Sequence, residues 1–363
     1  MARQLKADKV LFGAVIILVL FGLTMVFSAS AVIASERYGS STYYLVRQGV
    51  WALLGLSVMV IMMNVDYRRL SNPLVIFPAL GLQVLMLFVA LLWDPSHNTH
   101  RWLHIGRVSF QPSELSKIVI IIFLAYFLAM RKDEISDWKR TLLPIGLVVG
   151  IDAVLILREP DFGTTLALAL IVAAMLFAAG LPLVYFGFGL LAAFPVIFLL
   201  IFHVGYRLKR MMAFLHPYAD PLGTGFQILQ SYIAVGTGGI SGVGLMEGKQ
   251  KLFFLPEPQT DFIFAVISEE LGFIGAIAVL ILFGVILWRG LRAAARCSDD
   301  FGRLLAIGLT VMVVGQALVN ISVVIGLLPT KGIPLPLVSY GGSSLVMTLL
   351  AIGILLNISQ NTS

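Results

Sequence analysis

The run VLFGAVIILVLFGLTMVFSASA, Val10–Ala31, decides the fold class because it is long enough to cross a bilayer as one helix. A membrane-spanning helix needs about 20 consecutive apolar residues. The run exceeds the apolar core of a signal peptide and lacks a convincing cleavage site, so we expect a retained first span. Hydrophobic residues make up 59% of the chain and the mean hydropathy is +0.97, which excludes a soluble fold.

Similar apolar runs recur along the whole chain and predict an all-α, polytopic membrane protein of ten transmembrane helices. We interpret residues 1–363 as a single transmembrane domain, without a soluble domain or an internal repeat. A long extracytoplasmic loop, about 203–261, is expected between helices seven and eight. The predicted spans are approximately 10–34, 46–63, 74–93, 114–130, 141–157, 164–179, 184–202, 262–288, 301–328 and 345–358.

Basic residues in the short connections predict the orientation, because Lys and Arg gather on the cytoplasmic side. One side carries twelve against six on the other, which predicts that both termini are cytoplasmic. The single cysteine, Cys297, permits no internal disulfide and is expected to be a reduced, inert thiol on that side. The twelve basic residues are Arg3, Lys6, Lys9, Arg68, Arg69, Arg131, Lys132, Lys139, Arg140, Arg289, Arg292 and Arg296.

The long connection is basic as well, which gives the net charge of +6 a local meaning. On the outer side, such residues could meet an anionic lipid headgroup or a diphosphate. Nucleic acid is not a plausible partner there. The basic residues of this connection are Arg207, Lys209, Arg210, Lys249 and Lys251.

The stretch LPEPQTDFIFAVISEELG, Leu255–Gly272, places acidic residues at the start of a predicted hydrophobic helix. This is unusual because only 12% of the chain is charged. Carboxylates at a bilayer boundary are costly to desolvate, so a functional site centred on Asp261 is our first hypothesis. The alternative is that Asp261 only caps a helix that begins at Phe262, since Asp is a good N-cap.

A first outward-facing polar segment runs from Arg101 to Lys117. Ser113 is expected to cap a helix on which Glu114 and Lys117, three residues apart, share one face. These two charges form either part of a site or a structural ion pair. Trp102 lies in the same segment and is equally compatible with an interfacial anchor.

A second polar segment, REPDFG at Arg158–Gly163, places Glu159 and Asp161 in one turn, where a salt-bridged turn is the simpler interpretation. Asp152 lies earlier, inside the predicted fifth span. A carboxylate at that depth normally faces a partner or a wet cavity.

The long loop itself contains a glycine run, Gly236–Gly244, whose amides could face phosphates, although tight re-entrant turns are the simpler interpretation. The run matches no nucleotide-binding pattern. Earlier in the loop, Gln227, Gln230 and Ser231 have helical spacing and predict a short helix with a polar stripe.

A fourth segment, PTKGIPLPLVSYGGSS at Pro329–Ser344, is too rich in proline and glycine for a continuous helix. Irregular backbone at membrane depth is tolerated only where it is buried in protein or lines a cavity. Ser343 or Ser344 could cap the last helix, whose positive end would then face the same vestibule. No Ser-His-Asp order or zinc-ligand spacing emerges from the sequence.

Four of these motifs occur together in one known family. GIPLP at Gly332–Pro336, SYGGSS at Ser339–Ser344, QPSELSK at Gln111–Lys117 and LPEPQTDFIF from Leu255 resemble the SEDS family (shape, elongation, division and sporulation), which includes FtsW and RodA. The likeness extends from the first helix to the last. GKQKLFFLP from Gly248 and LPTKG from Leu328 look more like the septal than the elongation members, although Gln259 replaces the usual His.

The resemblance implies a peptidoglycan glycosyltransferase that polymerises lipid II on the outer face of the bacterial cytoplasmic membrane and releases undecaprenyl diphosphate. Asp261 occupies the essential acidic position and is expected to deprotonate the 4-hydroxyl of the acceptor sugar, with inversion at the donor carbon. A divalent cation, Mg²⁺ or Mn²⁺, is also expected, with unknown ligands. Residues expected to bind substrate or diphosphate are Arg101, Glu114, Lys117, Glu159, Asp161, Arg207, Arg210, Gln227, Gln230, Ser231, Lys331, Ser339, Tyr340 and Ser343.

The same resemblance implies a class B penicillin-binding protein as partner, within a division or elongation complex of membrane proteins. Two alternatives belong to other classes. A lipid II flippase would also use broken helices and intramembrane charges, but the polar motifs cluster on one side, whereas a transporter needs access from both. A scaffold that only activates a penicillin-binding protein would leave Asp261 unexplained.

Overall fold

The protein is an all-α membrane protein in the computed structural model, which describes residues 8–93, 100–106, 108–202, 205–330 and 332–361. Within these residues, nine helices are long and apolar enough to cross a membrane, which confirms the predicted fold class. They are α1 (Lys9–Tyr38), α2 (Tyr43–Asn64), α3 (Pro73–Trp93), α4 (Pro112–Met130), α5 (Leu143–Arg158) together with the π-helical turn before it (Trp138–Leu142), α6 (Phe162–Ala179), α10 (Ile263–Arg296), α11 (Asp300–Val324) and α12 (Gly342–Asn361).

The remaining predicted span, 184–202, corresponds to α7 (Leu183–Phe202), whose described apolar stretch is shorter. Two of the other spans end where the sequence did not predict. The span expected to reach residue 328 ends at Val324, because Gly326 takes a left-handed backbone with φ 76°. The span expected over 262–288 continues to Arg296 and is broken at Gly272.

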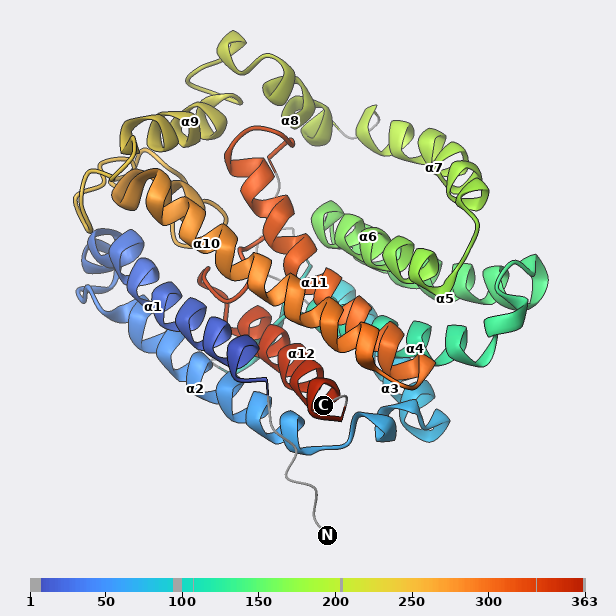
Figure 1. Cartoon of the computed structure of the whole chain (residues 1–363). Coiled ribbons are helices and arrows are strands. Elements are labelled where there is room, and N and C mark those ends of the chain that lie inside the picture. The colour runs from blue at the N-terminus through green and yellow to red at the C-terminus, as the bar shows by residue number, and fades with distance from the viewer. Residues whose placement is uncertain (1–7, 94–99, 107, 203–204, 331, 362–363) are drawn as a thin grey trace.

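The long connection between α7 and α10 is largely folded. It contains α8 (Gly205–Leu215), a 3₁₀ turn (Pro217–Ala219) and α9 (Phe226–Gly238), so the predicted short helix is confirmed. Figure 1 places α8 and α9 together at the top of the molecule, away from the C-terminal end of α12. A small hairpin, β1 (Leu103–Ile105) and β2 (Val108–Phe110), joins α3 to α4.

The centre of the bundle is formed by α4, α11 and α12, whose most apolar windows are 67%, 72% and 72% buried. The same windows of α2 and α5 are 22% buried, as expected for helices that face lipid. Small residues let helices approach closely inside a membrane. Gly353 of α12 illustrates this, because a Cβ there would lie 2.6 Å from the carbonyl oxygen of Met59 on α2.

Polar contacts gather the connections at two opposite ends of the bundle. At one end, Arg289 Nε lies 2.6 Å from Asp8 Oδ2, and Lys132 Nζ lies 2.9 Å from Asp300 Oδ2. The connection between α2 and α3 lies at this same end, where Tyr67 Oη donates to Asp299 Oδ1. The long connection, with α8 and α9, lies at the other end (Figure 1). This alternation agrees with the predicted order of spans, and the end that carries the long loop holds the site described next.

Asp152 finds partners inside the bundle, as its depth predicted. Its carboxylate is buried and accepts hydrogen bonds from Gln83 Nε2 at 2.9 Å and from Ser116 Oγ at 2.7 Å. These contacts join α3, α4 and α5 through one polar node. A buried carboxylate is tolerated when its lone pairs are satisfied in this way.

Candidate active site

Two adjoining cavities, of about 250 and about 440 Å³, open at the end of the bundle that carries the long loop. The smaller lies between α4, α6, α11, α12 and the 332–344 segment, and the larger lies between α6, α8 and the 328–332 segment. Asp261 lies at their junction. The residues that line both are Arg101, Asp161, Gly163, Asp261 and Gly332.

Asp261 is held by its backbone beside the irregular segment that follows α11. Asn320 Nδ2 of α11 donates to the Asp261 carbonyl at 2.8 Å, and Ser339 Oγ donates to the Thr260 carbonyl at 2.6 Å. The carboxylate faces Gly332, where a Cβ would lie 3.0 Å from Oδ2. The N-cap of α10 is Phe262 and has no side-chain cap, so the interpretation of Asp261 as a helix cap is wrong.

The electrostatic environment of Asp261 suits proton transfer. Burial disfavours the charged form, and the nearby Glu257 adds negative potential, so the pKa of Asp261 is raised from 3.8 to about 7. Arg210 and Arg101 oppose this rise in the pKa. A carboxylate that titrates near neutral pH can accept a proton far better than an ordinary one.

Several polar and charged side chains line the smaller cavity. Lys117 Nζ lies 2.9 Å from Glu114 Oε1 and 2.8 Å from Gln316 Oε1, with Glu114 and Lys117 both buried. The predicted ion pair is therefore confirmed, and it lines the cavity. Ser113 was predicted to cap α4, but the cap position belongs to Gln111, because the helix begins at Pro112. Further residues of this wall are Trp102, Thr164, Tyr340, Ser343 and Ser344.

The larger cavity combines guanidinium groups with apolar side chains. Arg207 lies over the ring of Phe162 at 5.5 Å, and Arg210 Nη1 donates to the Thr330 carbonyl at 3.2 Å. Arg101 is oriented by hydrogen bonds from Nε to the Glu159 carbonyl at 2.8 Å and from Nη2 to the Pro160 carbonyl at 2.6 Å. Leu166, Met211 and Leu328 supply an apolar wall. This combination suits an anion attached to a hydrocarbon chain.

Asp161 shapes the wall that the two cavities share. Oδ1 accepts from the Thr164 amide at 3.0 Å, and Oδ2 accepts from Thr164 Oγ1 at 2.7 Å and Gln111 Nε2 at 3.2 Å. As the N-cap of α6, Asp161 satisfies the Thr164 amide, which would otherwise lack an acceptor. Neighbouring Glu159 is fully buried and lines neither cavity.

Several residues predicted to bind substrate lie away from both cavities. Ser231 is buried on α9 and donates to the Val324 carbonyl at 2.7 Å, and Gln227 and Gln230 lie on the same helix. Ser339 braces the backbone beside Asp261 and lines neither cavity. Lys331 is outside the described residues. A role in substrate binding therefore stays a prediction for these residues.

The last amides of the glycine run have partners within the protein. The amides of Val243 and Gly244 donate to the carbonyls of Glu269 and Glu270 at 3.0 Å, so they are engaged in packing against α10. The first part of the run belongs to α9, and the part from Gly239 onward packs against α10.

Sequence reasoning missed two polar residues of α11 that organise the site. Gln316 links Lys117 to the Pro334 carbonyl, and Asn320 donates to the carbonyls of Asp261 and Ile333. Their spacing of four residues puts both on one face of an otherwise apolar span. Two polar residues on one face of an apolar span were the sequence signal that could have identified them.

The described residues include no cluster of three or more His, Cys, Asp or Glu side chains that could hold a metal. The oxygens of Asp161 already accept three hydrogen bonds. This part of the protein therefore does not fit a resident divalent cation held by protein ligands alone.

Comparison with known proteins identifies the family that the sequence motifs resemble, over nearly the whole chain. The profile of the cell cycle protein family that comprises FtsW, RodA and SpoVE matches residues 8–363. "Probable peptidoglycan glycosyltransferase FtsW" of Geobacter sulfurreducens is 42% identical over 356 residues, which cover 98% of this chain and 95% of the relative.

Solved structures agree in fold. A chain from "Structural coordination of polymerization and crosslinking by a peptidoglycan synthase complex" has a TM-score of 0.81 at 30% identity and covers 98% of both chains. The rod shape determining protein RodA of Thermus thermophilus has a TM-score of 0.73 at 28% identity, covering 99% of this chain and 98% of RodA. The predicted resemblance is confirmed, and the chain belongs to the FtsW/RodA/SpoVE family.

Proposed function

We propose that this chain is a peptidoglycan glycosyltransferase that polymerises lipid II into β-1,4-linked glycan, with Asp261 as the general base. We assign the reaction to this site because Asp261 lies at the junction of two cavities that are lined by different groups. One cavity offers three arginines and an apolar wall, and the other offers amide, hydroxyl and ammonium groups. A transferase that joins a lipid diphosphate donor to a sugar acceptor needs both.

In the reaction, Asp261 accepts the proton of the acceptor C4 hydroxyl as the oxygen forms a bond to the donor anomeric carbon. The bond from that carbon to the diphosphate oxygen breaks, and its electron pair leaves with undecaprenyl diphosphate. Attack opposite the leaving group inverts the anomeric centre. A pKa of about 7 keeps a useful fraction of Asp261 ionised at neutral pH while leaving it basic enough to accept the proton.

The larger cavity suits the donor. Arg101, Arg207 and Arg210 surround the space next to Asp261, and guanidinium groups stabilise the charge that develops on a leaving diphosphate. The apolar wall around Leu166 suits the first part of the polyprenyl chain.

The smaller cavity suits the acceptor sugar. Lys117, fixed between Glu114 and Gln316, presents a preorganised cation without solvent exposure. Tyr340 and Ser343 add further polar groups to the same wall. Such groups can orient hydroxyl and acetamido groups while Asp261 takes the proton.

We place the divalent cation with the substrate rather than in a protein-built site. Mg²⁺ often binds through substrate phosphates with few protein carboxylates, and the described residues offer no ligand cluster. Chelation followed by titration with Mg²⁺ or Mn²⁺ tests this proposal. A cation dependence that requires lipid II in binding measurements supports it, and tight binding to the protein alone contradicts it.

The proposed setting is the bacterial cytoplasmic membrane, with both termini in the cytoplasm and the site facing outward. A class B penicillin-binding protein is the proposed partner, and septal synthesis within a division complex is the proposed process. Labelling of single cysteines introduced at Lys139 and Asp220 tests the orientation, because the two positions should react from opposite sides. Depletion should give unseptated filaments, whereas rounded cells would indicate an elongation role.

The function is tested with purified protein and labelled lipid II, with and without a class B penicillin-binding protein, in the presence of Mg²⁺. We expect glycan polymer from the wild type and none from Asp261→Asn, whose side chain cannot accept the proton. A fully active Asp261→Asn variant contradicts the base assignment. If no correctly partnered preparation makes polymer, a flippase or a scaffold becomes the better interpretation.

A further inference from the structure

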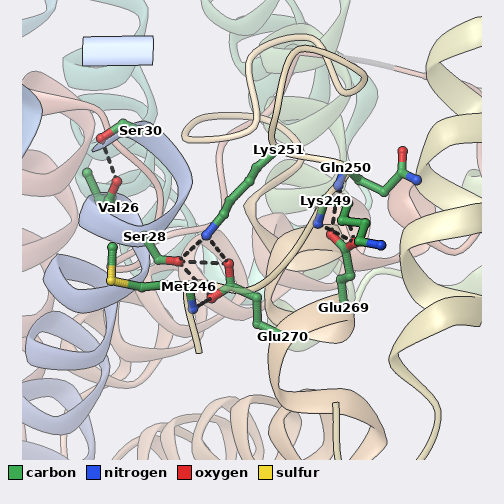
Figure 2. A network of polar contacts seen from close by, with 9 residues as sticks. All are labelled: Val26, Ser28, Ser30, Met246, Lys249, Gln250, Lys251, Glu269 and Glu270. Atoms are coloured by element: carbon green, nitrogen blue, oxygen red, sulfur yellow. Dashed lines mark hydrogen bonds and ion pairs between the residues drawn. The ribbon is translucent and has the colours of Figure 1, made fainter. Parts of the chain in front are cut away.

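A buried charge cluster lies outside both cavities, where the long loop meets α1 and α10. Lys251 Nζ lies 2.6 Å from Glu270 Oε1 and donates to Ser28 Oγ at 2.9 Å. Ser28 Oγ in turn lies 2.7 Å from both Glu270 oxygens. Exposure is 4% for Lys251, 0% for Glu270 and 2% for Ser28. Figure 2 shows Lys251 reaching from the loop to a point between Ser28 and Glu270.

Glu270, the residue of this cluster that belongs to α10, lies just before a break in the helix. Gly272 has φ 63° and ψ −161°, which interrupts the helical hydrogen bonds. The loop satisfies the groups released by the break. Val243 and Gly244 donate to the carbonyls of Glu269 and Glu270, while the amides of residues 273 and 274 donate to the carbonyls of residues 239 and 240. The first part of α10 is therefore a short helix, 263–271, that the loop holds in place.

The neighbouring carboxylate fixes the loop from the other side. Glu269, 3% exposed, accepts from the Lys249 amide at 2.8 Å and from the Gln250 amide at 3.2 Å. Glu270 Oε2 also accepts from the Met246 amide at 3.0 Å. Figure 2 shows these contacts next to the ion pair. Glu269 and Glu270, at the end of the short helix, thus bind the loop segment 246–250, which leads on to Asp261.

We propose that Lys251, Glu270 and Ser28 are positioning residues that fix Asp261 between the two cavities. The ion pair joins the two ends of the segment 251–270, and Asp261 lies close to its midpoint. Ser28 attaches this closed segment to α1. The reacting carboxylate therefore sits on a loop whose two ends are tied together and to the bundle. The inference deepens the proposed function and rests on it.

A second ion pair of the structure provides a matched control. Arg289 Nε of α10 and Oδ2 of Asp8, the N-cap of α1, are also 2.6 Å apart and tie α1 to α10 at the opposite end of the bundle, as Ser28 does beside Glu270. Neutralising either pair weakens the attachment of α1 to α10. Only the pair of Lys251 and Glu270 closes the segment that carries Asp261.

The test compares the double variant Lys251→Met/Glu270→Gln with the double variant Arg289→Met/Asp8→Asn. Replacing both charges avoids leaving one charge buried and unpaired, and Gln keeps an oxygen for the Met246 amide. Three quantities are measured for each: the unfolding temperature, amide hydrogen exchange of residues 252–262, and kcat and KM for lipid II polymerisation with a class B penicillin-binding protein.

We expect both double variants to lose stability. Only the Lys251/Glu270 variant should show at least tenfold faster exchange in residues 252–262. Its kcat should fall about 10- to 100-fold with KM changed less than threefold, because a displacement of about 1 Å at a reacting group costs up to about 100-fold. The control variant should keep kcat within twofold of the wild type.

Unchanged exchange in residues 252–262 would overturn the inference whether or not the protein polymerises lipid II. An equal fall of kcat in the two variants would also overturn it, because it would show that any loss of contact between α1 and α10 is enough. A wild type without polymerase activity but with the expected exchange difference would count against the proposed function and not against the positioning of Asp261.

Discussion

The acid limb of the pH–activity profile should report the ionisation of Asp261. With a pKa of about 7, about a tenth of the carboxyl groups are ionised at pH 6 and about nine tenths at pH 8. Because only the carboxylate can accept the proton, kcat/KM for polymerisation should rise about tenfold between these values and level off above pH 8. A carboxyl with an ordinary pKa of 3.8 would give a flat profile over this range.

Two neighbouring charges should move this limb in opposite directions. Glu257 raises the pKa of Asp261, so Glu257→Gln should move the limb to lower pH. Arg210 lowers that pKa, so Arg210→Gln should move the limb to higher pH. Arg210→Gln should also lower the plateau, because Arg210 lines the proposed donor cavity. The position of the limb and the height of the plateau are therefore read separately.

The assay is the initial rate of polymer formation from labelled lipid II between pH 5 and 9, at constant ionic strength and with substrate well below KM. Unfolding temperatures at each pH show that the protein stays folded. A profile that is flat between pH 6 and 8 would refute the assignment of Asp261 as the titrating base. Limbs that move in the same direction in both variants would refute the electrostatic account of its pKa.

The remaining predictions concern stability. The raised pKa of Asp261 means that its ionisation costs stability as pH rises from about 4 to 7, up to about 4 kcal/mol; Asp261→Asn should therefore raise the unfolding temperature at pH 8 and leave it unchanged at pH 4. Lys117→Met leaves Glu114 charged and buried and should cost about 3–5 kcal/mol in denaturant unfolding, most of which the added Glu114→Gln should restore. Gly272→Ala forces a positive φ on alanine and drives its Cβ into the backbone of Ile240 and Gly242, so it should cost more than the about 1–3 kcal/mol of backbone strain alone, whereas Gly284→Ala, with open space around it, should change the unfolding temperature little.

Hydrophobic spans were predictable because the cost of placing a residue in lipid depends mainly on the residue itself. The span predicted at 74–93 is observed as α3, Pro73–Trp93, and the short helix around Gln230 is observed as α9. Asp261 was identified for the same reason, because the cost of desolvating a carboxylate at a bilayer boundary does not depend on knowing its neighbours. The ends of spans were less predictable, as Gly326 shows, because a left-handed glycine can stop a helix inside an apolar run.

The sequence by itself determined the fold class, the order of the spans and the central carboxylate. Only the tertiary structure decided which segments meet, because contacts between helices depend on packing and not on local hydropathy. It placed Gln316 against Lys117, about 200 residues away in the chain, and engaged the amides of Val243 and Gly244 with carbonyls of α10. It also paired Lys251 with Glu270. A buried polar group must find a partner, and which partner it finds depends on how the folded chain brings the two together.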